Sequence, residues 1–166
     1  MECRNTNTLI KAHGGNEDVL RAVKICFEQE RNNMGDYVDQ WRFLPWYQQC
    51  ISVFDELLAN VRYSADQFDQ LVKTPARLLY DGVGDCKSMT IYIASCLWAL
   101  GADEITLRFV SHSNLRIYSH VYCIARKGAE TYTLDAVERD SNGNAIFNYA
   151  RPFVHKNDFN YIRSNG

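Results

Sequence analysis

The chain lacks the features that mark several large classes of protein. Its 166 residues carry a formal net charge of only −2, so nothing points to nucleic acid or an anionic membrane as a partner. No apolar run approaches the about 18 residues of a membrane-spanning helix, and segment 1–11 has no apolar stretch typical of a secretory signal. Repeats and low-complexity tracts are missing too. The sequence therefore predicts one globular domain, residues 1–166, in the cytoplasm.

The six cysteines show neither a disulfide framework nor a metal-binding motif. They contain no Cys-x-x-Cys pair, and without an export signal they are expected to stay reduced. Three of them, Cys26, Cys50 and Cys96, fall on apolar helical stripes. We expect these three to be small buried core residues.

Apolar spacing divides the chain into a helical half and a strand half. It predicts helices at 16–32, 45–61, 64–72 and 86–100, with a short helical turn at 74–79. The second half alternates apolar and polar residues, which predicts strands at 105–109, 118–126, 130–136 and 145–149. Helices followed by an antiparallel sheet are typical of an α+β domain.

Cys86 stands at the start of the clearest predicted helix, directly after the run Asp81-Gly82-Val83-Gly84-Asp85. The unpaired N–H groups at a helix N-terminus favour the thiolate form of a cysteine. The same groups can hold a developing oxyanion. The position therefore suits Cys86 as a nucleophile, although a buried structural cysteine is the plainer alternative. Asp85 can cap the helix, but its charge would oppose a thiolate.

The predicted hairpin brings a histidine and a carboxylate together. If Lys127-Gly128 forms a two-residue turn, His120 lies directly opposite Asp135 on the same face of the sheet, with Cβ atoms roughly 5 Å apart. Asp135 would then orient one ring nitrogen of His120 and leave the other for a thiol. Each residue alone has an ordinary structural explanation. Their joint register with Cys86 is what indicates catalysis.

Other candidate sites are weaker. His112 is a rival base, but it lies in a predicted polar loop with no carboxylate placed to orient it. A zinc site of Cys86, His120 and Cys123 is disfavoured, since residues three apart on a strand point to opposite faces. The run 148–156 mixes aromatic and basic residues, but it is too short and too weakly basic to predict nucleic-acid binding.

The central part of the chain resembles the bacterial and phage transglutaminase-like cysteine proteinases, which have a papain-like fold. That family shows a proline-led turn, Gly-Asp-Cys, a helix ending in Leu-Gly, a strand, a His-Val strand and then Asp-Ala. The corresponding residues here occur in the same order, over about 63–137: Thr74 to Lys87, Leu100-Gly101, Leu107 to Val110, Ser119-His120-Val121-Tyr122 and Leu134-Asp135-Ala136.

The resemblance implies a papain-like α+β fold in three parts: helices in 1–62, a catalytic core in 63–137 and a C-terminal extension of the sheet in 138–166. It implies that Cys86 attacks an amide or thioester carbonyl, that His120 is the base and that Asp135 orients it. Hydrolysis of a peptide or isopeptide-type amide is the expected reaction, on a protein or peptide substrate and without a metal or cofactor. A phage or prophage origin is also implied, and with it a place in the virion as an alternative to the cytoplasm.

The chain departs from the family pattern in places that leave alternatives open. Lys87-Ser88 follows the cysteine where relatives often carry an acidic residue, and the calcium cluster of the large animal transglutaminases is not visible. An upstream aromatic or Gln side chain often assists the oxyanion in the family, and the candidates here are Trp46, Gln40 and Trp41. An amine-accepting transglutaminase, or a catalytically silent binding or phage structural module on the same scaffold, remain alternative functions.

Overall fold

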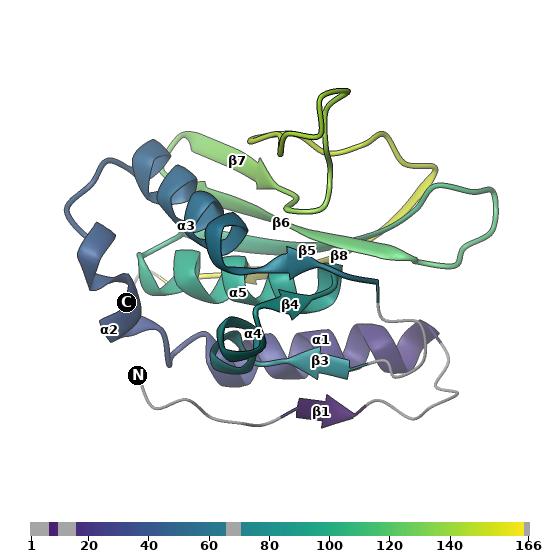
Figure 1. Ribbon diagram of the computed structural model, residues 1–166, viewed down its shortest axis with the longest axis horizontal. Coiled ribbons are helices and arrows are strands. Elements are labelled where there is room, and N and C mark those ends of the chain that lie inside the picture. Colours follow the sequence, from purple (N-terminus) through teal and green to yellow (C-terminus); the bar gives the residue numbers. More distant parts are fainter. Residues whose placement is uncertain (1–6, 10–15, 66–70, 165–166) are drawn as a thin grey trace.

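A computed structural model describes residues 7–9, 16–65 and 71–164. Helices come first and a four-stranded antiparallel sheet follows, which confirms the predicted α+β class (Figure 1). The helices are α1 (Asn16–Glu30), α2 (Gly35–Val38), the 3-10 turn η1 (Asp39–Trp41), α3 (Trp46–Asn60), α4 (Pro75–Asp81) and α5 (Cys86–Ala99). The strands of the main sheet, in spatial order, are β7 (Glu130–Leu134), β6 (His120–Lys127), β5 (Glu104–Ser111) and β8 (His155–Ile162).

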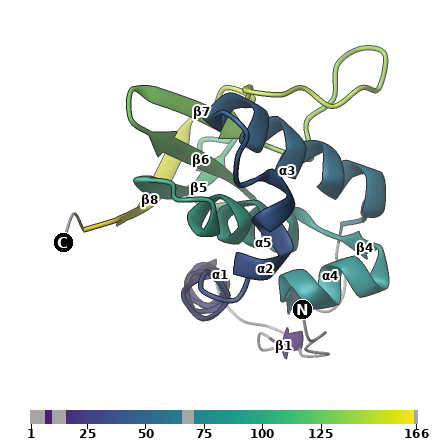
Figure 2. The ribbon, with the colours of Figure 1, turned by 90° about the vertical axis from the view of Figure 1, so that its left-hand side faces the viewer.

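Helix α5 forms the centre of the molecule. It packs on the sheet through β6 and is surrounded on its other sides by α1, α3 and α4 (Figure 2). Its core residues are apolar and almost fully buried, Ile91, Tyr92 and Leu97 among them. Because this burial removes a large apolar area from water, α5 is held rigidly against the sheet. The residue at its N-terminus is therefore held in a defined position.

The predicted helix at 64–72 is wrong where the structure describes it. Leu71–Lys73 is strand β3, which pairs antiparallel with β1 (Asn7–Leu9). Residues 66–70 of the predicted helix lie outside the described residues. The partner strand lies more than 60 positions away in sequence, so the local apolar pattern contains no sign of this pairing.

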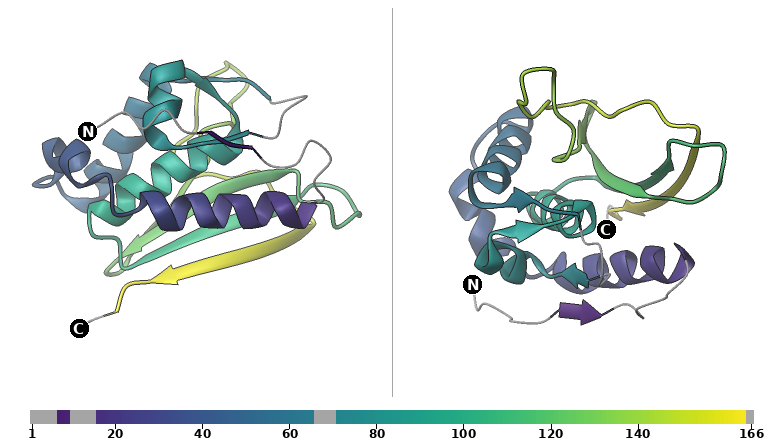
Figure 3. Two further views of the ribbon diagram at one scale, coloured as in Figure 1. Left: turned by 90° about the horizontal axis from the view of Figure 1, so that it is seen from below. Right: turned by 45° about the vertical axis from the view of Figure 1, so that its right-hand side comes forward.

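The fourth strand of the sheet is not at 145–149 as predicted. There Ala145 forms only an isolated bridge with Arg139, whereas β8 pairs with β5 along its whole length at one edge of the sheet (Figure 3). Asn and Asp residues are uncommon in strands, so local residue propensity does not predict β8. In the structure these residues pair across strands: Arg108 donates two 2.8 Å hydrogen bonds to Asp158.

The predicted helix ends at Thr74 and Gly101 are confirmed, and the one at Pro45 is shifted by one residue. The Thr74 hydroxyl caps α4, accepting a hydrogen bond from the backbone N–H of Arg77 at 3.2 Å. Pro45 is the N-cap of α3 rather than its first residue. Gly101, predicted to end α5, has a φ of +94°, a conformation that side chains disfavour.

The five cysteines that the structure describes are free thiols. Cys26, Cys50 and Cys96 are buried as predicted, and Cys123 is fully buried too. Cys3 lies outside the described residues. No helix among these residues has both the length and the apolar character to cross a membrane.

Candidate active site

Cys86 is the first residue of α5 and is 9% exposed. Asp85 caps the helix, because its Oδ1 accepts hydrogen bonds from the backbone N–H groups of Lys87 at 3.0 Å and Ser88 at 3.2 Å. The Lys87 ammonium contacts the other carboxylate oxygen of Asp85. This ion pair offsets the negative charge beside the thiol, which the sequence alone left as an objection to a thiolate.

A glycine allows the chain to enter α5 along this path. Gly84 is one residue of β4 (Val83–Gly84), which pairs in parallel with β2 (Arg62–Tyr63). A Cβ atom at Gly84 would lie 2.3 Å from Leu78 Cδ1, so any side chain there would collide with α4. The segment before Cys86 is therefore pressed between β2 and α4, which positions the start of α5.

His120 and Asp135 form a hydrogen-bonded pair. The distance from His120 Nε2 to Asp135 Oδ2 is 2.6 Å, and Asp135 is only 2% exposed. The other oxygen of Asp135 accepts the backbone N–H of Val137 at 3.1 Å, which fixes the orientation of the carboxylate. Because Nε2 is bonded to Asp135, Nδ1 is the ring nitrogen left for Cys86.

The electrostatic environment of His120 favours its protonated form. Burial alone would lower its pKa, but hydrogen bonds to Asp135 and Cys86, together with their negative charges, outweigh burial and raise the pKa to about 10. The structure thus brings Cys86, His120 and Asp135 together. The arrangement can pass a proton between the thiol and the imidazole, with the carboxylate holding the ring.

The pair forms through a different register from the predicted one. The turn is Gly128-Ala129, so Lys127 pairs with Glu130 and Cys123 with Leu134. The predicted register is two residues off. Glycine takes the first turn position, with a φ of +60°. Because a shift of two keeps every side chain on its predicted face, Asp135 still reaches His120, now diagonally across the strands.

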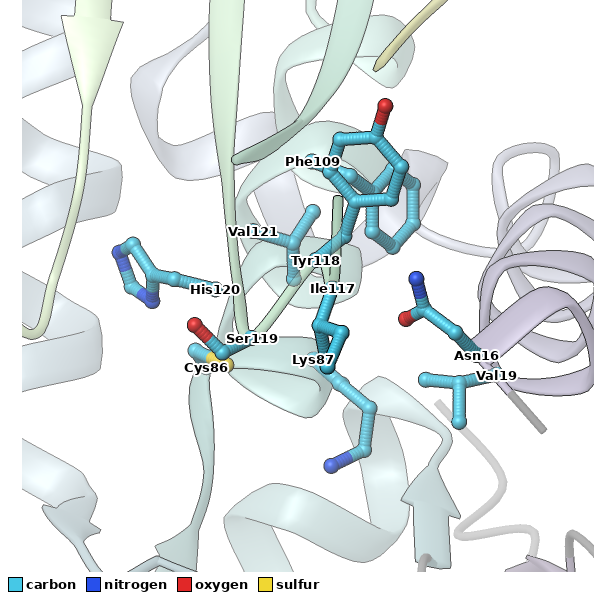
Figure 4. Close-up of a pocket in the computed structure, with 10 residues that line it drawn as sticks. All are labelled: Asn16, Val19, Cys86, Lys87, Phe109, Ile117, Tyr118, Ser119, His120 and Val121. Carbon is cyan, nitrogen blue, oxygen red and sulfur yellow. The ribbon is translucent and has the colours of Figure 1, made fainter. Parts of the chain in front are cut away.

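A pocket opens beside Cys86 and His120. Its volume is about 330 Å³, and it lies between the N-terminal turn of α1 and strands β5 and β6 (Figure 4). Cys86 and His120 line one side and α1 lines the other. The reactive atoms are therefore accessible from a hollow rather than sealed in the core.

Sequence reasoning missed Tyr63, the last residue of β2, which pairs with Gly84 beside the nucleophile. Burial raises the pKa of Tyr63, and the negative charges of Cys86, Asp85 and Asp135 raise it further. The phenol of Tyr63 therefore lies near all three charges, and its hydroxyl stays protonated and able to donate a hydrogen bond. The signal was available in part, since Tyr63 opens the stretch that resembles the family.

The three predicted oxyanion candidates lie elsewhere. The Lys127 ammonium lies 5.4 Å from the centre of the Trp46 ring and donates a hydrogen bond to the carbonyl of Leu100. Trp46 is therefore near the C-terminal end of α5. Trp41 and Gln40 contact Tyr37, whose hydroxyl bonds Tyr92 midway along α5. The prediction is corrected: these side chains belong to the packing around the middle and the C-terminus of α5. Cys86 is at the other end, roughly 20 Å from the last residue at 1.5 Å per residue.

Two further polar residues, Glu138 and His112, lie close to His120. Glu138 places a carboxylate oxygen within 4.8 Å of ligand atoms of His120 and Asp135, and the ring centroid of His112 is 6.2 Å from that of His120. Burial lowers the pKa of His112, and the charges of Arg151 and His120 lower it further. His112 is therefore a neutral neighbour of the pair, and its buried Nε2 has no hydrogen-bond partner among the described residues.

The group of His120, Asp135 and Glu138 is a poor metal site. Calcium takes six to eight oxygen ligands, whereas this group offers two carboxylates and a nitrogen, and two of its ligand atoms already bond each other. Within the described ranges no group joins Cys86 and Cys123 at a metal-binding distance. The chemistry available here is proton transfer.

No protein-family model and no curated protein sequence matches the chain. Among solved structures, a candidate protease from Parabacteroides distasonis ATCC 8503 is similar with a TM-score of 0.58 and 11% identity, over 75% of this chain and 27% of that one. Calcium-bound LapG from Legionella pneumophila is similar with a TM-score of 0.51 and 19% identity, over 75% of this chain and 74% of that one. The chain thus spans about a quarter of the Parabacteroides protein. The likeness shows a shared α+β fold, with helices packed on an antiparallel sheet.

Proposed function

We propose that this protein is a thiol-dependent acyl-transfer enzyme of the transglutaminase-like, papain-fold kind, which hydrolyses a peptide or isopeptide-type amide. The observation that carries the proposal is that His120, bonded to Asp135 at 2.6 Å, lines one pocket with Cys86 at the N-terminus of α5. Cys86 is the nucleophile, His120 the base and acid, and Asp135 the residue that orients His120.

In the first half of the reaction the Cys86 sulfur attacks the amide carbonyl carbon. A C–S bond forms and the carbonyl π electrons move to oxygen. The N–H of Cys86 is not among those that Asp85 accepts, so it is placed to hold the oxyanion, with the Tyr63 hydroxyl as second donor. The intermediate then collapses: the C–N bond breaks, the amine takes a proton from His120 and a thioester remains.

In the second half, water replaces the amine. His120, now neutral, takes a proton from water as the oxygen attacks the thioester carbon. The C–S bond breaks, the acid product leaves, and the thiolate–imidazolium pair is restored. Water is the default acceptor because the pocket beside Cys86 is open. An amine in the same place would give transglutaminase chemistry with the same three residues.

Independent features support this assignment. The Lys87–Asp85 ion pair removes an unfavourable charge next to the thiol, and the raised pKa of His120, about 10, keeps the imidazole protonated beside it at neutral pH. The four other described cysteines are buried core thiols, so Cys86 is the one with a base. The shared fold with a candidate protease agrees with a protein or peptide as substrate.

The decisive experiment measures iodoacetamide labelling of each cysteine against pH by peptide mapping. In the wild type, Cys86 is expected to be labelled much faster than the buried thiols already at pH 6, because it lies beside His120 at a helix N-terminus. In His120→Ala this early reactivity disappears. Amide hydrolysis, which also needs the imidazolium to protonate the amine, is expected to decline as the pH rises through about 10, where His120 loses its proton.

The matched control is His155→Ala, which removes a histidine at the sheet edge whose Nε2 lies 3.2 Å from the Asn114 carbonyl. This variant should label like the wild type, and circular dichroism should show all three proteins folded. A Cys86 that labels only as an ordinary thiol, with no change in His120→Ala, contradicts an enzyme and favours a binding module on the same scaffold.

A further inference from the structure

The pocket beside Cys86 has an apolar wall next to the polar groups of Asn16, Lys87 and Ser119. Four apolar side chains from separate elements line it: Val19 from α1, Phe109 from β5, Ile117 from the loop between β5 and β6, and Val121 from β6. Phe109 and Val121 are each only 2% exposed and form the floor, whereas Ile117 is 58% exposed. A large aliphatic side chain left in water at the edge of a pocket is a surface that an apolar ligand can cover.

Several polar groups around this pocket already have partners. The Asn16 amide can bond both the carbonyl and the N–H of Tyr118 at 3.0 Å, and the Ser119 N–H donates to the Val110 carbonyl at 3.1 Å. Lys87 is paired with Asp85, and its ammonium points away from the floor (Figure 4). An aliphatic group of a ligand would therefore be stabilised mainly by covering the exposed side chain of Ile117 and the wall beside it.

The two Asn16 hydrogen bonds also hold the pocket wall in place. They tie the start of α1 to the backbone of Tyr118, next to Ile117 in the loop. Two residues further along, the chain reaches His120. One connection thus positions both the aliphatic wall and the strand that carries the base.

We propose that this pocket is the subsite for an aliphatic side chain of the substrate, and that Ile117 determines this specificity. The inference rests on the proposed function, because the side chain would belong to a residue next to the bond that Cys86 attacks. The substrate class is therefore a polypeptide with a Leu-, Ile- or Val-like residue beside the cleaved amide.

The test uses thiol reagents whose N-substituents can enter the pocket beside the Cys86 sulfur. Iodoacetamide, its N-pentyl derivative and its N-(3-carboxypropyl) derivative all react alike: the Cys86 sulfur displaces iodide and a C–S bond replaces the C–I bond. Labelling rates at Cys86, divided by the rates with glutathione, remove intrinsic differences. The pentyl reagent is expected to react roughly tenfold faster than iodoacetamide, the discrimination typical of a small apolar pocket, and the carboxylate reagent no faster.

The loop supplies a matched pair of variants. Ile117→Asp and the milder Ile117→Ser should abolish the advantage of the pentyl reagent. Leu115→Asp, which changes an equally large aliphatic residue that is 64% exposed and outside the pocket, should keep it. Equal rates for pentyl and parent reagents in the wild type, a faster carboxylate reagent, or equal effects of Ile117→Asp and Leu115→Asp would overturn the subsite.

This readout separates the two proposals. The ratio of the labelling rates of two reagents reports the preference of the pocket even when each rate is low. The rate with iodoacetamide itself, and its dependence on His120, reports the reactivity of the thiol. A normal thiol with a clear pentyl preference would reject the enzyme and retain the apolar pocket, whereas a reactive thiol without the preference would do the reverse.

Discussion

The two ends of α5 use the same helix in opposite ways. At the N-terminus, Asp85 accepts the N–H groups of Lys87 and Ser88, but the N–H of Cys86 is not part of that cap. The thiol beside it borders a pocket and faces an imidazole. Backbone donors and the positive end of the helix dipole are thus left available to a reacting group.

At the C-terminus, cationic side chains bond the last backbone carbonyls. Lys127 Nζ donates to the carbonyl of Leu100 at 3.1 Å, and Arg42 reaches that of Ala99 at 3.4 Å. Arg163 donates to the carbonyls of Trp98 and Ala102. Cations at the negative end of the dipole are stabilising, so this end serves stability.

The contrast explains how a small domain can keep one helix end open. A backbone N–H left free at a solvent-accessible helix end costs stability, and the cations at the opposite end together with the buried middle of α5 offset that cost. It also explains the misplaced oxyanion candidates, since aromatic residues such as Trp46 pack where the cations are. Removing groups from each end should therefore have different consequences.

The largest effect is expected at Asp135. Asp135→Asn keeps the size of the side chain but removes its charge and replaces one of its two acceptor oxygens with a donor, so His120 is no longer held as before and amide hydrolysis should fall by roughly 10³-fold or more. Cys86 labelling at pH 6 should fall as well, because the imidazolium loses a stabilising charge. Hydrolysis is measured once a peptide substrate is found, and labelling can be measured at once.

The control for this variant is Asp158→Asn, which breaks the ion pair with Arg108 on the sheet. It should lower stability slightly and leave labelling unchanged. If Asp135→Asn is unfolded by circular dichroism, or labels like the wild type, Asp135 is a structural residue and the network at the N-terminal end needs reassignment.

A smaller effect is expected at Tyr63. Tyr63→Phe removes only the hydroxyl, and loss of one oxyanion donor typically lowers kcat by roughly 10²-fold. Iodoacetamide labelling of Cys86 should be unchanged, because alkylation creates no oxyanion. The matched variant is Tyr80→Phe, at a tyrosine that is 68% exposed on α4. Equal kcat values in both variants would remove Tyr63 from the site.

Much of the site was predictable because it depends on short-range patterns. The glycine run and the helix that follows place Cys86, and alternation along two adjacent strands puts His120 and Asp135 on one face. The predicted turn is one residue too early, so the register is two residues off. His120 and Asp135 still lie on the same face of the sheet, because side chains on a strand alternate between the faces every residue. Tyr63 could not be placed in this way, since its position depends on the parallel pairing of β2 with β4.

The fold was less predictable where pairing is long-range or chemically unusual. The apolar spacing around strand β3 is typical of a helix, and its strand conformation depends on pairing with β1 near the start of the chain. Strand β8 contains Asn157, Asp158 and Asn160, which local propensity disfavours in strands. They are accommodated by partners such as Thr106, whose hydroxyl donates to Asn160 Oδ1 at 2.8 Å. These partners lie about 50 residues away, outside any local window.

The smallest expected effects compare the two ends of α5 directly. Lys127→Met removes the ammonium that bonds Leu100 but keeps the apolar stem, and should lower the free energy of unfolding by about 1 kcal/mol. Asp85→Ala removes the N-cap at a similar cost of about 1 kcal/mol. Only Asp85→Ala should also change the labelling rate of Cys86, because it alters the first turn and frees Lys87. Urea unfolding and labelling on the same samples measure both quantities. If Lys127→Met changed labelling as much as Asp85→Ala, the two ends would be coupled through α5, and the division between a stabilising end and a reactive end would fail.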